Sequence, residues 1–513
     1  MKQEVVFYQR ESFIYIVAAF ISVFLSVWMN LHETVINRDA ICYVLSAEAM
    51  GRSSIQAAMH ECPQAKWPFY SMLIYGLSNM TSLSYVVAAY FLDGVFSIIS
   101  VLAFLAILKE LSHSTRLMWL GLFVIVCSHQ FNSVRQYIIR DHGFWALYLV
   151  SLFFLLQYFR HFKRADAFFW GGSLAAATLF RIEGAIFLMG LPFLSWFFPR
   201  QTLRQRLGHF VTLNIILFFV CASMVGWMLI HPHQTVGNLG RIQEVVNQFE
   251  QGLLMMLDRY QGMKAQLILH VLSYDAVREA GLVLALTICV WYLVNVLSNL
   301  SWIYSLLVLY AWRSKAAILK QSDGLVLASY LFVNFLITFT FFVEHSFLSK
   351  RYLIAFSLVL MLWVPFALDR LLLQANRFRA RSLFAGVATL IFISLMSSMI
   401  HFGYSKAYIR DAGIWIAQNV PDKASIYMND SQLMYYSSHY RNDFFSIAHR
   451  YTHADSLSHG QWKQYHYIAF HLNKQDDAKV LTIMQEIPLM PVKEFANARG
   501  DKVVIFKVKE TVG

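Results

Sequence analysis

Charged residues are scarce in this 513-residue sequence, at 14% against roughly 25% in a typical soluble domain. Apolar residues make up 58% of the chain, and the mean hydropathy is +0.49. These proportions exclude an ordinary soluble enzyme, a disordered chain and a collagen-like repeat. Five cysteines are too few for a disulfide scaffold of this length. We therefore expect one large membrane body with a soluble remainder.

Lysine and arginine outnumber aspartate and glutamate by 42 to 30, which gives a net charge of +12. Binding to nucleic acid would require these basic residues to gather on one solvated surface. They fall instead in short runs between apolar segments, a pattern typical of multi-spanning membrane proteins. We expect no nucleic-acid partner.

The distribution of charge also predicts a domain boundary. Residues 404–513 contain 24 charged side chains, about 22%, whereas residues 1–403 are only about 12% charged. We predict a transmembrane catalytic domain over 1–403 and a small soluble α/β domain over 404–513. The patterns in this tail predict helices at 405–419 and 474–485 and strands at 424–428, 465–472 and 503–508. It contains no glycine-rich phosphate loop, metal-spaced Cys/His set or Gly-x-Ser-x-Gly motif, so a binding or capping role is the default.

About eleven stretches approach the roughly 20 apolar residues that a bilayer crossing needs. They are 12–31, 84–108, 116–131, 142–160, 166–180, 183–198, 209–230, 278–311, 324–343, 350–371 and 383–402. The third, fifth and sixth are short, and the eighth is long enough to contain a break. The first lacks an Ala-x-Ala-like cleavage site and reads as a retained anchor. The predicted fold class is thus mainly α, a polytopic membrane protein with interfacial helices.

Lysine and arginine in the connections predict the orientation, because short cytoplasmic loops are enriched in them. With the N-terminus in the cytoplasm, all five basic clusters fall on the cytoplasmic side. These clusters are Lys109/Arg116, Arg160/Lys163/Arg164, Arg200/Arg204/Arg206, Arg313/Lys315/Lys320 and Arg370/Arg377/Arg379/Arg381. The same orientation places residues 32–83, 231–277 and the tail outside. We predict a bacterial inner-membrane protein with a periplasmic C-terminal domain.

The two long outer segments, 32–83 and 231–277, both have apolar residues at helical spacing, and we predict interfacial helices in them. A new helix is expected to begin at Pro68. Cys42 and Cys62 share the first segment. A disulfide in an oxidising compartment and two unrelated thiols are both open interpretations.

Ionisable residues at membrane level are functional candidates, because each costs several kcal/mol unless it is paired or hydrated. The predicted topology gathers a mixed set on the outer face, whereas the inner loops contain cations with only sparse acids. The set comprises Arg38, Asp39, Lys66, Asp93, Arg135, Arg140, Asp141, His142, Arg181, Glu183, Glu344, His345, Lys350 and Arg351. The plainer alternative is helix-end capping with local pairs, namely Arg140 with Asp141, Arg181 with Glu183 and Arg38 with Asp39.

Carboxylates beside cations at this depth suit one chemistry particularly well. A carboxylate can deprotonate a hydroxyl as a general base, and cations can stabilise the charge that develops on a departing phosphate. If that phosphate belongs to a lipid, the reaction must take place at the membrane interface. The composition of the set therefore points to transfer of a sugar from a polyprenyl phosphate to an acceptor.

Five motifs in order along the chain resemble those of the C-type (GT-C) integral membrane glycosyltransferases. The resemblance is strongest to protein O-mannosyltransferases, the lipid A aminoarabinose transferase and the rhizobial lipopolysaccharide glycosyltransferases. The motifs are Asn37-Arg38-Asp39-Ala40-Ile41-Cys42-Tyr43, Trp67-Pro68-Phe69-Tyr70, Ile139-Arg140-Asp141-His142-Gly143-Phe144, Leu179-Phe180-Arg181-Ile182-Glu183-Gly184 and Lys350-Arg351-Tyr352-Leu353. Two departures stand out: Ala40 follows Asp39 where family members often have a second acid, and a Pro-Pro pair is reduced to Trp67-Pro68.

The resemblance implies roles for individual residues. Asp39 would be the general base of an inverting transfer, and Asp141 a second carboxylate that orients the acceptor or a nearby cation. Donor phosphate binding would fall to Lys350, Arg351, Arg181 and His345. Supporting roles would fall to Arg38, Tyr43, Arg140, His142, Glu183 and Tyr352.

For some of these residues the sequence leaves two interpretations open. Glu183 is read as a partner that orients Arg181 rather than as a base, and His142 as a hydrogen-bonded helix-start residue rather than a phosphate ligand. Asp93 reads as a buried polar contact. No cofactor is required, although carboxylates near a phosphate could bind a divalent metal. The expected partners are a polyprenyl-phosphate sugar donor, a lipid, glycan or protein acceptor, and membrane lipids.

Two other functions compete with this one. O-antigen polymerases and ligases also use lipid-linked sugars at the outer face, but they generally depend on a large outer loop late in the chain. Transporters tend to have internal repeats with broken helices near the midplane, and the sequence shows no convincing repeat. The position of the charges at one interface favours the glycosyltransferase.

Overall fold

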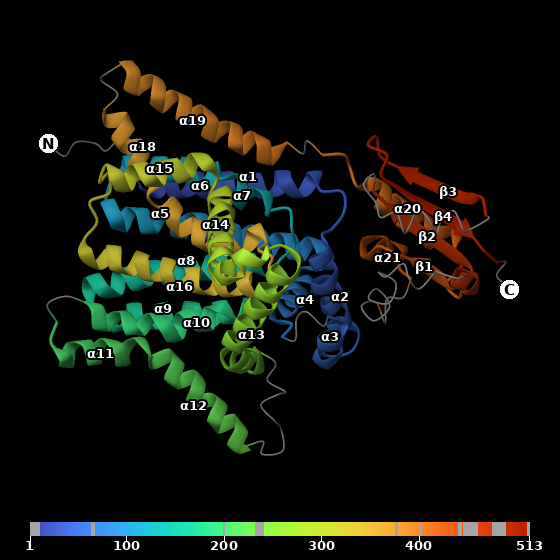
Figure 1. Cartoon of the computed structure of the whole chain (residues 1–513), viewed down its shortest axis with the longest axis horizontal. Helices are drawn as coiled ribbons and strands as arrows, with labels where there is room; N and C mark the ends of the chain where they lie inside the picture. Colours follow the sequence, from blue (N-terminus) through green and yellow to red (C-terminus); the bar gives the residue numbers. More distant parts are fainter. Residues whose placement is uncertain are drawn as a thin grey trace. The chain divides into compact units, whose positions relative to one another are not determined.

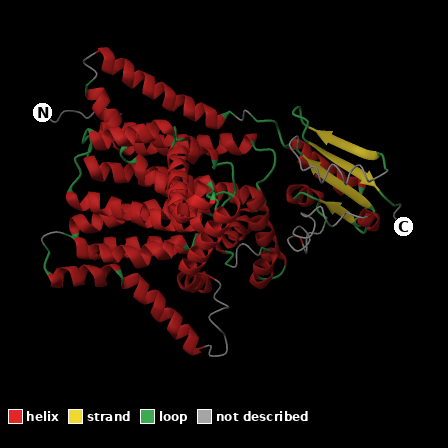
Figure 2. Cartoon of the chain, viewed as in Figure 1, coloured by secondary structure: helices red, strands yellow, loops and turns green. Residues whose placement is uncertain are grey.

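The structure is a computed structural model that describes residues 11–62, 67–198, 201–230, 241–374, 378–400, 403–439, 444, 460–473 and 489–509. Helices dominate it, and a small sheet lies in the C-terminal part of the chain (Figures 1 and 2). The chain forms two compact units. The first contains residues 1–27, 93–135 and 140–399, and the second contains residues 28–92, 136–139 and 400–513. The predicted boundary at residue 403 is not tested by this division and stays a prediction.

Seven of the described helices are long and apolar enough to cross a membrane. In the order of the chain these stretches are Glu11–His32 (α1), Tyr85–Ser112 (α5), Asp141–His161 (α8), Tyr274–Leu300 (η4–α14), Gln321–His345 (α16), Lys350–Leu373 (η5–α18) and Arg381–Met399 (within α19, Phe378–Met399). A bent pair, Leu203–Leu213 (α11) and Ile215–Ser223 of α12 (Ile215–Ile230), meets at 46° and would make an eighth. The predicted multi-spanning helical fold is confirmed.

The remaining helices of the first unit are shorter or less apolar. They are Thr115–Val126 (α6), His129–Ser133 (α7), Arg164–Phe180 (α9), Glu183–Gly190 (α10), Leu191–Phe197 (η2), Arg241–His270 (α13) and Trp302–Arg313 (α15). The η5–α18 stretch divides into Lys350–Leu353 (η5), Ile354–Met361 (α17) and Val364–Leu373 (α18), and η4 and α14 cover Tyr274–Glu279 and Ala280–Leu300. Since α6 and the α10–η2 pair are shorter than a full crossing, the number of eleven spans stays a prediction.

The break expected in the eighth apolar segment occurs at Ser301. This residue has a φ of 73°, so it cannot continue α14, and its hydroxyl accepts a hydrogen bond from the Tyr304 amide to cap α15. The helix expected in the segment 231–277 is α13.

Ion pairs join helix ends at the side of the first unit that the charge pattern predicts to be cytoplasmic. Arg160, at the end of α8, lies 3.0 Å from Glu110 of α5 and 2.6 Å from Asp323 of α16. Arg116 pairs with Asp369, and Lys109 pairs with Glu11. Each of these pairs joins two different helices, so the few acids on this side meet its cations across helices rather than within one loop.

Buried polar side chains connect α8, α9 and α16 in the middle of this unit. The Tyr330 hydroxyl lies 2.8 Å from the Ser151 hydroxyl and accepts a hydrogen bond from Trp170 Nε1 at 3.2 Å. Such bonds hold helices together where lipid removes most of the hydrophobic driving force between them. They fix α16 against α8, which matters because both helices carry residues of the candidate site at one end.

The second unit combines three helices that follow the first span with an α/β tail. The helices are Arg38–Arg52 (α2), Ile55–Glu61 (α3) and Phe69–Thr81 (α4), which confirms the helical prediction for this segment, including the start after Pro68. Cys42 of α2 and Cys62 after α3 are disulfide-bonded, with their Cα atoms 5.3 Å apart. Of the two interpretations left open, the structure contains the disulfide. Lys66 lies outside the described residues.

The tail forms a four-stranded sheet with helices beside it. Its elements are Ala407–Asn419 (α20), Ile426–Met428 (β1), Ser431–Ser437 (α21), Tyr467–Leu472 (β2), Pro491–Ala496 (β3) and Lys502–Lys507 (β4). The strand order is β1-β2-β4-β3; β1 pairs with β2 in parallel, and the other pairs are antiparallel. The predicted helix at 405–419 and the three predicted strands are confirmed, and the predicted helix at 474–485 lies outside the described residues. Strand β3 and helix α21 were not predicted.

Candidate functional site

A guanidinium group at one end of the first unit binds two carboxylates from different helices. Arg181 directly follows α9, Asp141 is the first residue of α8, and Glu183 is the first residue of α10. Arg181 Nη1 donates to Asp141, and its Nε and Nη2 donate to Glu183 Oε1, the Nε bond being 3.0 Å long. All three side chains are largely buried. Negative charge is favoured at both carboxylates because each begins a helix, where the peptide dipoles present their positive end.

The local backbone brings these groups together. Arg181 is extended, with φ of −141°, so α9 ends there and α10 can begin two residues later. Gly184 allows this tight turn, since a Cβ at that position would lie 2.7 Å from the Thr178 amide nitrogen. Gly143 likewise lets α8 approach the ring of Phe180, to which a Cβ would come within 2.4 Å. The Arg-x-Glu-Gly motif therefore has a steric as well as an electrostatic basis.

Tyr352 of η5 connects this cluster to a second arginine. The Cζ atom of Arg181 lies 4.6 Å from the centre of the Tyr352 ring, and that of Arg351 lies 5.3 Å from the same centre. Both are cation–π distances. The Tyr352 ring also packs edge-on against Phe341 of α16. The Lys350-Arg351-Tyr352 motif is thus joined to the Arg-x-Glu-Gly motif, although about 170 residues separate them in the chain.

These side chains line a cavity of about 550 Å³. Its charged lining residues are Arg140, Arg181, Glu183, Glu344, His345 and Arg351. Apolar side chains form much of the rest of the wall, among them Phe144, Ile186, Leu336, Ile337, Phe341 and Leu348. Along α16 the lining extends from Asn334 to His345, which is about 16 Å of helix. The cavity therefore combines charged groups near the helix ends with a wall that is apolar in larger part, to which Asn334, Thr338 and Thr340 of α16 add neutral polar side chains.

Nη1 of Arg140 and Oε2 of Glu344 are polar atoms of this lining that are buried without a hydrogen-bond partner among the described residues. A buried donor or acceptor that makes no hydrogen bond costs about 1–3 kcal/mol. The first can donate to an anion and the second can accept from a hydroxyl or amine, so the cavity offers both a donor and an acceptor to a ligand.

Several residues of the predicted set lie apart from this cavity lining. Lys350 is exposed and is not among the lining residues, although its neighbour Arg351 is. Arg135 is buried and donates to Ser22, Ser26 and Asn132 instead of joining the cluster. Asp93 is buried within α5. The shared membrane level that the topology predicted for all of these residues does not bring them into one pocket.

His142 and His345 have different surroundings. His142 is buried and its Nε2 lies 3.1 Å from the Val134 carbonyl oxygen, the kind of contact expected for a helix-start residue. His345 is about half exposed, stacks on Phe341 with ring centres 4.2 Å apart, and lines the cavity. Only the second is positioned to meet a ligand in this cavity.

The first acidic motif belongs to the second unit. Asp39 is in the first turn of α2 and is partly buried. Tyr43, one turn later, is buried with its ring 5.1 Å from that of Tyr70. Arg38 extends to Asp430, with Nη2 3.3 Å from Oδ2. Among the described residues, no three histidine, cysteine, aspartate or glutamate side chains are grouped so that they could hold a metal ion.

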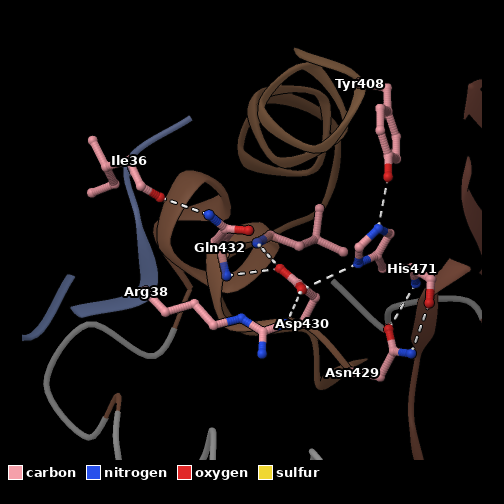
Figure 3. Close-up of polar contacts among 8 residues, drawn as sticks. Ile36, Arg38, Tyr408, Asn429, Asp430, Gln432 and His471 are labelled. Carbon is pink, nitrogen blue, oxygen red and sulfur yellow. Dashed lines mark hydrogen bonds and ion pairs between the residues drawn. The ribbon is translucent and has the colours of Figure 1, made fainter. Parts of the chain in front are cut away.

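Asp430 is a heavily bonded carboxylate of the second unit, and the sequence reasoning missed it (Figure 3). It precedes α21, and its Oδ1 accepts from the amides of Gln432 and Leu433 at 2.8 and 3.0 Å. Burial alone would raise its pKa, but the hydrogen bond and charge of His471, the Leu433 amide and Arg38 lower the pKa to about 2. An aspartate at the N-cap position is by itself only a weak helix-start signal. Its side-chain partners Arg38 and His471 are remote in sequence, and no pattern in the sequence indicated them.

No protein-family model matches this chain. No curated protein matches it either. Among solved structures, the oligosaccharyltransferase of Archaeoglobus fulgidus in complex with zinc and sulfate matches 89% of this chain and 68% of its own, with 13% sequence identity and a TM-score of 0.51. ArnT of Cupriavidus metallidurans bound to undecaprenyl phosphate matches 98% of each chain, with 12% identity and a TM-score of 0.49. At 13% identity this likeness concerns the fold alone, and at that level the resemblance to membrane glycosyltransferases inferred from the motifs is confirmed.

Proposed function

We propose that this protein is an integral membrane glycosyltransferase that moves a sugar from a polyprenyl-phosphate donor to an acceptor hydroxyl. The reaction would take place at the periplasmic face of a bacterial inner membrane, with a lipid, a glycan or a protein as the acceptor. One observation carries the proposal. The cavity of the first unit combines three arginines and two glutamates near the helix ends with a wall built in larger part from apolar side chains of several helices. That combination suits a ligand with a charged head and a hydrocarbon chain.

The arginines are suited to bind the donor phosphate. Arg351 lines the cavity from η5, and Arg140 contributes the buried Nη1 that has no partner among the described residues. Guanidinium groups bind phosphate oxygens through parallel hydrogen bonds, and they stabilise the charge that develops when the phosphate leaves. Arg181 adds positive charge, but its N–H groups already donate to Asp141 and Glu183. We therefore expect Arg181 to contribute less to phosphate binding than Arg351 and Arg140. The exposure of Lys350 makes it a weaker candidate than Arg351, while His345 can contribute from the cavity wall.

The carboxylates take different roles in this proposal. Asp39, by the resemblance, is the general base: it takes the proton of the acceptor hydroxyl while the acceptor oxygen attacks the anomeric carbon. The bond from that carbon to the phosphate oxygen breaks on the opposite side, which inverts the configuration. Asp141 and Glu183 are held by Arg181, which supports a role in orienting the guanidinium group rather than in proton transfer.

The test is transfer by the purified full chain in lipid nanodiscs, with a panel of radiolabelled pentoses and hexoses linked to polyprenyl phosphate and with membrane extracts as acceptors. At least one donor should support transfer. A hydrogen bond to a charged group contributes about 1.5–3 kcal/mol, so Arg351→Ala should raise the donor KM about ten- to a hundredfold.

The matched control is Arg313→Ala at the exposed end of α15, which should leave the donor KM unchanged. The proposal fails if folded protein transfers no sugar from any donor of the panel. The assignment of Arg351 fails if its substitution and the control give the same donor KM.

A further inference from the structure

A network of side chains centred on Asp430 ties three parts of the second unit to one another (Figure 3). In addition to its two bonds to the start of α21, Asp430 accepts through Oδ2 from His471 Nδ1 at 3.1 Å and from Arg38 Nη2 at 3.3 Å. The other ring nitrogen of His471 lies 2.8 Å from the Tyr408 hydroxyl of α20. The side chain of Asp430 is 2% exposed. Its position is therefore set by β2, α20 and α21 together.

Helix α21 also reaches the backbone of the chain just before α2. Gln432 Nε2 donates to the Ile36 carbonyl oxygen at 2.7 Å, and the Tyr436 hydroxyl accepts from the Ile36 amide at 3.0 Å. Both main-chain polar groups of one loop residue are thus bound by side chains nearly 400 residues later in the chain. Ile36 itself is buried.

The next residue, Asn37, is held from another direction. It occupies the N-cap position of α2, but its side chain does not cap the helix. Its Oδ1 accepts from the Ile138 amide at 2.9 Å, and its Nδ2 donates to the Ile138 carbonyl at 3.3 Å. Residues 36, 37 and 38 are therefore each bound by a different remote group, and Asp39 follows directly.

We propose that α21 and its cap residue Asp430 act as a positioning element that fixes the start of α2 and, through it, the carboxylate of Asp39. Gln432 and Tyr436 are the main positioning residues, because their bonds are short and Ile36 is buried. Arg38 contributes less, since its side chain is 72% exposed. The C-terminal segment, to which the sequence assigned no chemistry, would thereby act on the transfer reaction without touching either substrate.

The physical reason is the geometric demand on a general base, which must lie within hydrogen-bond reach of the proton that it removes. A misplacement of about 1 Å can lower a rate about a hundredfold. The N-cap side chain of α2 does not cap the helix, so the bonds made to residues 36–38 contribute directly to the position of its first turn. This inference rests on the proposed function for its catalytic consequence, but the structural coupling can be measured separately.

The experiment uses Gln432→Met and Tyr436→Phe in the full chain, with Gln418→Met on the exposed face of α20 and Tyr404→Phe as matched controls. Hydrogen–deuterium exchange reports the coupling. Loss of one hydrogen bond should make amide exchange at residues 36–39 about fivefold faster in the first two variants and leave it unchanged in the controls. Exchange at wild-type rates in both variants would overturn the proposal.

Kinetics then distinguish positioning from a general loss of structure. Each of the two variants should lower kcat for transfer at least about tenfold with little change in donor KM. In an Asp39→Asn background, the same substitutions should cause no further decrease, because they act through Asp39. A decrease of equal size in that background would refute the role in positioning the base.

The outcomes for the two proposals are separable. If wild-type protein transfers no sugar from any donor, the proposed function fails, while the exchange data still decide whether α21 holds the start of α2. If Gln432→Met does not fold, Tyr436→Phe removes a single hydroxyl and carries the same comparison. Normal transfer together with normal exchange in Tyr436→Phe would overturn the positioning role and leave the proposed function standing.

Discussion

Replacing Arg181 by methionine should destabilise the folded protein strongly, because it removes the cation shared by two buried carboxylates. The side chains of Asp141 and Glu183 are 5% and 18% exposed, and that of Arg181 is 14% exposed. Breaking a buried ion pair by removing one partner typically costs about 3–5 kcal/mol. Arg140 and Arg351 remain near the stranded carboxylates as cations of the same cavity, so we expect a value near the lower limit, about 3 kcal/mol.

Two further variants separate charge from packing. In the triple variant Arg181→Met, Asp141→Asn, Glu183→Gln, no charge is left uncompensated, so most of the lost stability should return. Arg116→Met breaks the ion pair with Asp369 at the other end of the unit, where the arginine side chain is 49% exposed. An exposed pair contributes about 0–1 kcal/mol, so this control should change stability little.

The assay is unfolding of the purified proteins in mixed micelles with a rising fraction of sodium dodecyl sulfate, followed by circular dichroism. The free energies of unfolding of wild type, Arg181→Met, the triple variant and Arg116→Met are compared under one condition. If Arg181→Met costs no more than Arg116→Met, the description of Arg181 as the shared partner of two buried carboxylates is refuted. If the triple variant is as unstable as the single one, packing of the guanidinium group dominates instead of charge.

Three other substitutions test separate parts of the structure. Asp39→Asn should lower the transfer rate by about 10²–10⁴-fold, because a general base typically contributes that factor. The free energy of unfolding should be unchanged, and near-normal transfer would remove Asp39 from the mechanism. Cys42→Ser opens a loop with a sequence separation of 20, so thermal unfolding should show a loss of about 3 kcal/mol, and an unchanged free energy would contradict the disulfide. Folding lowers the pKa of Asp430 from 3.8 to about 2, so the ionised carboxylate stabilises the folded protein by about 2 kcal/mol above about pH 4. This stabilisation should be lost as the pH falls toward 2. Asp430→Asn should lack that acid-dependent step in stability, and a step of the same size in the variant would assign it to another group.

Most of the membrane helices could be predicted because a long apolar run is sufficient to specify one. Helix α13 and the helices after the first span followed equally from apolar spacing. Strand β3 could not be predicted in the same way. It lies at an edge of the sheet with most of its side chains exposed, so it lacks the alternation that marks a half-buried strand. Helix α21 has only seven residues, too few for a periodic pattern to be distinctive.

The candidate site was only partly accessible to the same reasoning. The bond between Arg181 and Glu183 joins residues two positions apart and was considered from the motif alone. The bond between Arg181 and Asp141 spans 40 positions, and that between Arg38 and Asp430 spans 392. From neighbouring residues in the sequence, the adjacent Asp39 was the only partner that could be suggested for Arg38. The sequence did not indicate Asp430, which the fold brings within 3.3 Å of Arg38.

The sequence by itself determined that the chain belongs in a membrane, that charged motifs interrupt its apolar segments, and that these motifs resemble those of GT-C glycosyltransferases. Hydropathy and spacing determine such features because they depend on the contact of each segment with lipid or water. Only the tertiary structure decided which charges meet. It placed Arg351 and Glu344 in one cavity, left Lys350 and Arg135 out of it, and connected Arg38 to Asp430. The reason is that pairing between remote side chains depends on how helices and strands pack, and a single sequence carries no direct record of that packing.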